Sequence, residues 1–156
     1  MFGLFGTRED KQLREKITWA QDASHEILMT QMELGGASSD PDSRRRLATP
    51  YGFGYVFGFA DALIQRAGLT NDGKIMAELA IAHMRLFGTE QGPKIFSASL
   101  DRQADPKFLE GRRTGGAEAS QWLSSGGKEI PSGLSDYLSG GSRAAPGQSV
   151  AHRGFP

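Results

Sequence analysis

The chain has 156 residues, enough for one domain of ordinary size. Its 18 basic and 18 acidic side chains leave no net charge, which argues against a dedicated nucleic-acid-binding protein because such proteins normally carry a basic surface. The absence of cysteine excludes disulfides, thiolate metal sites and cysteine nucleophiles.

The chain starts with a short apolar stretch that contains Met1, Phe2, Leu4 and Phe5 and precedes the first charges. This stretch lacks the length and order of a secretory signal, and no apolar run reaches the roughly 18 residues that suggest a membrane span. We therefore expect a soluble, cytoplasmic protein. Peripheral membrane contact through these four side chains is a weaker hypothesis, because the helix predicted to follow them has a polar face of mixed charge.

A long amphipathic helix is predicted to begin after Thr7 and to end at the pair Gly35 and Gly36. Thr7 is a suitable N-cap, acidic residues follow it in the first turn, and apolar residues then recur at helical spacing. Glycine is the usual residue just beyond a helix end. Residues 35–48 are expected to form a flexible loop, because Gly, Ser, Asp and Arg dominate them. We treat residues 1–48 as an N-terminal helix and loop.

Residues 49–124 are predicted to form a compact core of about four helices. Thr49-Pro50 starts the first of them, which contains the most apolar run of the chain, and Asp105-Pro106 starts the last. A capping residue followed by proline is a start signal, because proline at the first helical position loses no hydrogen bond. Gly88 is expected to end the second helix, with a shorter helix after it.

Two of these predicted helices share a pattern of small residues. Both contain glycines four residues apart, followed by alanine, an acidic residue and alanine, and the second copy comes 57 positions after the first (54 to 111 and 58 to 115). Glycines at this spacing place two small residues on one helix face, where another backbone can approach closely. We expect the two faces to pack on each other or on one common neighbour. The residues are Gly54, Gly58, Ala60, Asp61 and Ala62, and Gly111, Gly115, Ala117, Glu118 and Ala119.

Residues 125–156 are rich in Gly, Ser and Pro and poor in large apolar side chains. Such a segment buries too little surface to offset its conformational entropy, so we expect a tail that is disordered or ordered by a partner. Leu134, Tyr137 and Leu138 would share one side of a helical turn and could form a short docking motif. The alternative is a tail with three apolar residues by chance, which we favour because such motifs are degenerate.

Two clusters of arginine are candidate binding residues for phosphate, acidic lipid or RNA. Arg44, Arg45 and Arg46 lie in the predicted loop, and Arg112 and Arg113 lie on the last core helix. The simpler interpretation is a solvated surface, which we favour because acidic residues precede the first cluster. For the acidic residues of the repeated pattern, Asp61 and Glu118, we favour pairing with a nearby arginine over a catalytic role.

A metal-dependent enzyme is a third-ranked hypothesis that rests on Asp22, His25 and His83. Asp22 and His25 have the spacing found in helical di-iron sites, but those sites need two such motifs and two further carboxylates. We therefore expect no metal and no cofactor. His83 lies on the apolar face of its predicted helix, where a histidine of the core is the simpler expectation.

The sequence as a whole predicts an all-α protein: a long N-terminal helix, a compact helical core and a C-terminal tail. We identify no catalytic residues and expect a non-enzymatic adaptor, regulator or assembly component that binds a protein partner or itself through the first helix and the tail. The alternative is a small-ligand or lipid-binding domain with a pocket between the helix of residues 50–68 and the helix of His83. Such a pocket would be lined by Tyr51, Tyr55 or Met84.

Overall fold

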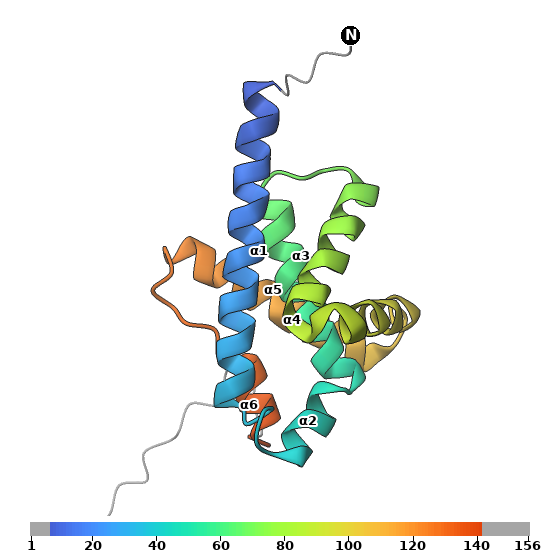
Figure 1. The fold of residues 1–156 in the computed structure, drawn as a ribbon. Coiled ribbons are helices and arrows are strands. Elements are labelled where there is room, and N and C mark those ends of the chain that lie inside the picture. The colour runs from blue at the N-terminus through green and yellow to red at the C-terminus, as the bar shows by residue number, and fades with distance from the viewer. Residues whose placement is uncertain (1–6, 142–156) are drawn as a thin grey trace, which may run out of the picture.

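The computed structural model describes residues 7–141, and these residues form six helices and no strand (Figure 1). The all-α class is therefore confirmed. The four apolar side chains at the N-terminus that were considered for membrane contact lie outside the described residues. None of the described helices combines the length and the apolar character needed to cross a membrane. The helices are α1 (Arg8–Leu34), α2 (Pro41–Leu47), α3 (Pro50–Arg66), α4 (Asp72–Asp101), α5 (Pro106–Ser124) and α6 (Gly133–Leu138).

Helix α1 has the predicted bounds, because local interactions determine both of its ends. The Thr7 side chain accepts a hydrogen bond from the Asp10 amide, and the Asp10 carboxylate accepts one from the Thr7 amide, which completes a capping box. At the other end Gly35 caps the helix, and Gly36 adopts a positive φ of 84°. The 27 residues of α1 span about 40 Å, and the first turns extend beyond the other helices (Figure 1).

Helix α1 packs on the core along one face instead of standing apart from it. Leu28 is buried, and Leu13, Ile17 and Ile27 are partly buried against the two hydrophobic clusters of the protein. The same face buries two glutamines of α1, which reach polar groups on other helices. The N-terminal helix is therefore part of the folded domain, and its opposite face is left for solvent or partners.

The centre of the fold is the pair α3 and α5, which pack through the predicted glycine faces. A Cβ on Gly54 would lie less than 3.0 Å from the backbone carbonyl group of Phe108. A Cβ on Gly111 would come as close to the backbone carbonyl of Tyr51. Since real Cβ atoms essentially never approach backbone that closely, only glycine fits at either position. Of the two predicted arrangements, packing of the faces on each other is the one observed.

The next turn of the pair repeats this arrangement. Gly58 faces the backbone of Arg112, and Gly115 faces the backbone of Tyr55, again with no room for a Cβ. In every case a glycine meets the residue three positions before the matching glycine of the other helix. The two helices are therefore parallel and related by a local two-fold pseudo-symmetry, which explains why the pattern is repeated in the sequence.

Helix α4 changes direction at Gly88, as its sequence predicts. Gly88 has φ 84° and ψ 163°, which is not helical, and the chain resumes a helix directly after it. The second part of α4 returns across the first and passes close to its backbone. A Cβ on Gly92 would lie less than 3.0 Å from the backbone of Met84, so only glycine fits at this crossing. This return brings Phe96 onto Phe57 of α3, with ring centroids 6.4 Å apart.

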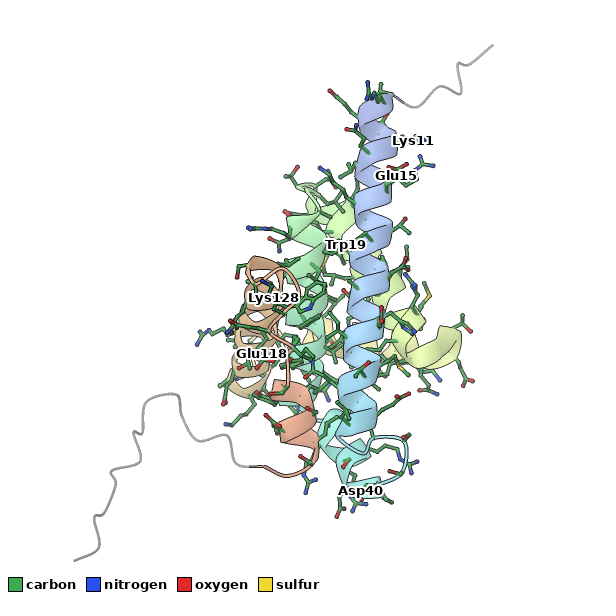
Figure 2. All side chains as sticks on the ribbon, turned by 90° about the vertical axis from the view of Figure 1, so that its left-hand side faces the viewer. Lys11, Glu15, Trp19, Asp40, Glu118 and Lys128 are labelled. Atoms are coloured by element: carbon green, nitrogen blue, oxygen red, sulfur yellow. The ribbon has the colours of Figure 1, made fainter. Side chains whose placement is uncertain are left out.

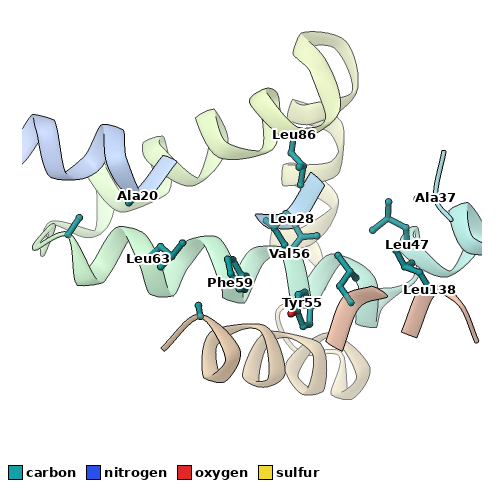
Figure 3. Close-up of a cluster of buried hydrophobic side chains, with 13 residues drawn as sticks. Ala20, Leu28, Ala37, Leu47, Tyr55, Val56, Phe59, Leu63, Leu86 and Leu138 are labelled. Carbon is teal, nitrogen blue, oxygen red and sulfur yellow. The ribbon is translucent and has the colours of Figure 1, made fainter. Parts of the chain in front are cut away.

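Two segments that were expected to lack structure contain helices. Residues 35–48 include α2, because Asp40 caps a helix that starts at Pro41 and Leu47 is buried. The same signal, a capping residue followed by proline, marks the starts of α3 and α5. The predicted tail contains α6, whose Leu134 and Leu138 are 0% exposed. The core therefore extends beyond residue 124, and its larger cluster joins side chains from α1 to α6 around Tyr55 and Phe59 (Figure 3).

Candidate functional site

A groove between α1 and the segment that leads from α5 to α6 is the main candidate site. It has a volume of about 420 Å³. Figure 2 looks onto this side of the molecule, with Trp19 on α1 and Lys128 on the connection in view. We call it the tryptophan groove and define it by six of its lining residues: Trp19, Ile27, Leu34, Trp122, Ile130 and Pro131.

Large apolar side chains are exposed in this groove. Trp19 is 47% exposed, Leu34 is 73% exposed and Ile130 is 77% exposed. The rings of Trp19 and Trp122 stack with their centroids 6.0 Å apart, so the two indoles form one surface. Single exposed apolar residues are common on proteins, whereas several in one groove are typical of a site that binds a protein or an apolar ligand.

The charged residues that line the tryptophan groove are both acidic. Asp22 and Glu26 lie on α1 one turn apart. Asp22 forms an ion pair of 2.6 Å with Arg85 of α4, whereas Glu26 takes part in no ion pair within residues 7–141. The groove therefore combines an apolar floor with a negatively charged edge on α1.

A buried polar cluster holds the far wall of the groove in place. The Tyr55 hydroxyl lies 2.6 Å from the Glu118 carboxylate and 3.1 Å from the Gln31 amide nitrogen. Glu118 also accepts a hydrogen bond of 3.0 Å from the Gly133 amide, and Gln31 accepts one of 3.0 Å from the Leu134 amide. The first two backbone amides of α6 are thereby bound by side chains of α5 and α1.

The Tyr55 hydroxyl remains protonated in this cluster. Burial, and secondarily the neighbouring Glu118 carboxylate, raises the pKa of the Tyr55 phenol well above its ordinary value. The phenol can therefore donate its hydrogen to Glu118 at any physiological pH. Because buried polar groups are costly unless they are hydrogen-bonded, the cluster specifies where α6 docks. Ile130 and Pro131, which directly precede α6, are positioned with it.

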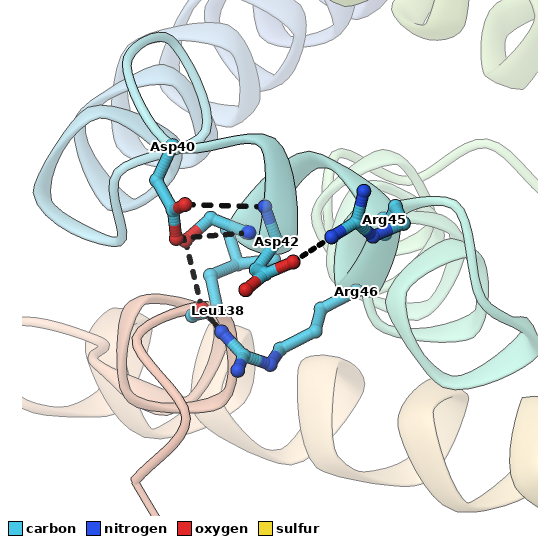
Figure 4. A network of polar contacts seen from close by, with 6 residues as sticks. Asp40, Asp42, Arg45, Arg46 and Leu138 are labelled. Atoms are coloured by element: carbon cyan, nitrogen blue, oxygen red, sulfur yellow. Dashed lines mark hydrogen bonds and ion pairs between the residues drawn. The ribbon is translucent and has the colours of Figure 1, made fainter.

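The first arginine cluster is divided among different roles (Figure 4). Arg46 donates a hydrogen bond of 2.7 Å to the carbonyl oxygen of Leu138, at the C-terminal end of α6. Arg45 pairs with Asp42 within α2, and Arg44 is exposed. The structure therefore places Arg46 in a structural contact and does not bring all three guanidinium groups together.

The Asp40 carboxylate, which caps α2, supports the contact between α2 and the end of α6. Hydrogen bonds from the Ser43 side chain, and more weakly from its backbone, lower the pKa of the Asp40 carboxyl. The Ser43 hydroxyl lies 2.7 Å from Asp40 and 2.9 Å from the Leu138 carbonyl oxygen. Helix α2 thus anchors the C-terminal end of α6, while the buried cluster anchors its beginning.

The second arginine cluster also divides. Arg112 forms an ion pair of 3.3 Å with Asp61, hydrogen-bonds the Gln103 side chain and lies over the ring of Phe57. The predicted pairing of Asp61 with an arginine is confirmed. Arg113 is exposed and lines a second groove of about 910 Å³.

The second groove lies between the start of α3, α5 and α6, and we call it the tyrosine groove. Its lining includes Tyr51 and Tyr137, with ring centroids 4.4 Å apart. Lys107 and Arg113 also line it, together with the carboxylates of Asp105, Glu110 and Glu118, and Lys107 pairs with Glu110. Tyr51 was expected to line a pocket between α3 and α4. The structure places Tyr51 here instead, against Tyr137 of α6, and Tyr55, one turn further along α3, is buried in the core.

Asp22 and His83, two of the three residues of the metal hypothesis, have separate environments. Asp22 is paired with Arg85, and His83 is 0% exposed between the rings of Phe57, Phe87 and Phe96. The Nδ1 atom of His83 lies 2.8 Å from the carbonyl oxygen of Leu79, and burial lowers the pKa of the imidazole. Among residues 7–141 no three histidine or carboxylate side chains are grouped so that they could hold a metal ion.

Comparisons of the chain with protein-family models, with curated proteins and with solved structures found no match. The candidate function therefore rests on the geometry of the chain itself. The site residues predicted from the sequence did not include Trp19, Trp122, Ile130 or Pro131. Trp19 carried a usable signal, because a tryptophan outside the buried stripe of an amphipathic helix has no place in the core.

Proposed function

We propose that this protein is a non-enzymatic helical adaptor or assembly component that binds a protein partner at the tryptophan groove. The observation that supports this most directly is that Trp19, Leu34 and Ile130 are exposed and line one groove. The groove is formed by α1 and by the segment after α5, the two regions expected from the sequence to mediate contacts.

Several buried polar residues take part in contacts that hold helices together. Tyr55 and Glu118 bind the start of α6, and Asp61 binds Arg112. His83 is enclosed by aromatic rings. These roles favour a binding protein over an enzyme.

A photoreactive crosslinking residue placed at position 34 tests this proposal in cells. Leu34 is 73% exposed, so the replacement should leave the fold intact. The same residue at Ile81, which is 39% exposed on α4 and lies outside the tryptophan groove, is the matched control. We expect a discrete crosslinked species from position 34 and none from position 81. Failure to crosslink at position 34, with a monomeric mass by light scattering at all concentrations, would refute the proposal.

Removal of α1 and the C-terminal segment is not a suitable test. Ala20 and Leu28 of α1, and Leu134 and Leu138 of α6, are buried in the core. A protein reduced to residues 50–124 would expose their contact surfaces, so it would lose stability for reasons unrelated to partner binding.

Binding of a small ligand at the tyrosine groove is the second candidate. Its volume of about 910 Å³, its aromatic floor and the exposed cation of Arg113 suit a ligand that combines an aromatic ring with an anionic group. A set of aromatic carboxylates and phosphates tests this by thermal shift. Stabilisation of the wild type but not of Arg113→Ala supports the second candidate, and no shift with any member contradicts it.

A further inference from the structure

The α1 wall of the tryptophan groove has the length and shape of a helix-binding surface. Trp19, Ala23, Ile27 and Leu34 lie along one side of α1, over a distance of about 22 Å at 1.5 Å per residue. This is about four helical turns. The backbone groups of α1 are engaged within the helix, so this wall offers no edge to which an extended strand could add. An amphipathic helix, which presents apolar side chains every three to four residues, matches such a wall.

The negative charge of the groove determines which polar residues a bound helix should carry beside its apolar stripe. Asp22 and Glu26 are the charged lining residues of the groove. The ion pair with Arg85 partly neutralises the charge of Asp22 and leaves that of Glu26 unchanged. A bound helix with Lys or Arg beside its apolar stripe would meet Glu26, whereas one with acidic residues there would be repelled.

We infer that the tryptophan groove binds an amphipathic, basic helix of about 15 residues that belongs to a partner protein. This inference rests on the proposed function and specifies the chemistry of the partner.

A second copy of the described chain does not supply a matching helix. Helix α2 exposes Arg44 and Arg45 but has only seven residues. The exposed first turns of α1 carry acidic and basic side chains together. A separate protein is therefore the better source of a long basic helix.

The chain offers an intrinsic probe for this site. It contains two tryptophans, Trp19 and Trp122, and both line the groove. Indole emission depends on exposure to water, so occupation of the groove should shift the tryptophan fluorescence of the full-length protein. The probes are two synthetic peptides of about 16 residues without tryptophan. Both have leucine at helical spacing along one face, with lysine at the remaining positions of one peptide and glutamate at those of the other.

We expect the lysine peptide to shift the emission to shorter wavelength and to bind about tenfold more tightly than the glutamate peptide at low salt. The difference should shrink at about 0.5 M salt, because exposed charges are then screened. Glu26→Lys should reduce the preference for the lysine peptide about two- to fivefold. Leu34→Ala should weaken binding of the lysine peptide about tenfold, whereas Ile81→Ala should leave it unchanged.

The outcomes separate the two proposals. Equal binding of both peptides, or tighter binding of the glutamate peptide, overturns the inference of a basic partner and leaves the proposed function standing. Binding that is insensitive to Leu34→Ala overturns the inference that the groove is the site. No emission change with either peptide, together with a crosslink from position 34 to a second copy of the chain, overturns it in favour of self-association. No emission change and no crosslink refute the inference and the proposed function together.

Discussion

Substitution of Gly115 by alanine should destabilise the protein, although alanine is the better helix former. In an open helix the change would stabilise by about 1 kcal/mol. Here the new Cβ would lie less than 3.0 Å from the backbone of Tyr55, which cannot give way as the end of a flexible side chain could. Forced overpacking of this kind costs typically 1–3 kcal/mol, and two rigid backbones place Gly115→Ala near the upper limit. The expected net loss is about 2 kcal/mol.

The neighbouring Gly116 is the matched control. A Cβ on Gly116 would meet only the Gly58 carbonyl oxygen, at an ordinary contact distance of 3.5 Å. Gly116→Ala should therefore stabilise by about 0.5–1 kcal/mol, so the two variants should differ by about 3 kcal/mol. At about 2–4 °C per kcal/mol, their melting temperatures should differ by roughly 6–12 °C. A Gly115→Ala protein that melts at or above the wild-type temperature would refute close packing of α3 on α5.

Three further predictions follow from the buried polar groups and the contacts of α6. Tyr55→Phe should lower the free energy of unfolding by about 1–3 kcal/mol, since it removes a hydrogen bond to a buried carboxylate. Hydrogen exchange should then accelerate at the first amides of α6, and unchanged exchange would contradict the role of this cluster in anchoring α6. Stability should fall as the pH drops below about 6.5, because His83 is protonated in the unfolded chain there while burial keeps the folded imidazole neutral. In thermal melts, His83→Gln should lose this component of the pH dependence. A variant with the same pH profile as the wild type would contradict the assignment to His83. Arg46→Ala should lower the free energy of unfolding in urea by about 1 kcal/mol and Arg44→Ala by less than about 0.5 kcal/mol, because Arg46 binds the Leu138 carbonyl and Arg44 is exposed. Equal losses would contradict this assignment.

The two grooves differ in how far sequence reasoning could identify them. Tyr51 was expected to line a pocket between α3 and α4, whereas it lines the groove with α5 and α6, because periodicity does not show which neighbour covers each face of a helix that is buried nearly all round. Trp19 and Trp122 are separated by about a hundred residues and meet only after α1 and α5 have both packed on α3. No local pattern connects them, so the tryptophan groove could not have been derived from spacing.

Helix starts, helix ends and the glycine faces were determined by the sequence itself. Thr7, Thr49 and Asp105 cap helices through hydrogen bonds to amides two or three residues away, so these signals are complete within one turn. Gly88 breaks α4 through its own backbone angles. The repeated glycine pattern also predicted close backbone contact, because a face without side chains has room for another backbone, although it left open whether the two faces meet each other or a common neighbour.

The position of α6 was decided only by the tertiary structure. Taken alone, residues 125–141 have too few apolar side chains to fold, which is why a separate tail was expected. In the folded protein the amide of Leu134 binds Gln31, 103 positions earlier, and α6, with its buried Leu134 and Leu138, contacts α1, α2 and α5. The stabilisation of α6 thus comes from surfaces outside its own sequence, and the same docking forms the far wall of the tryptophan groove.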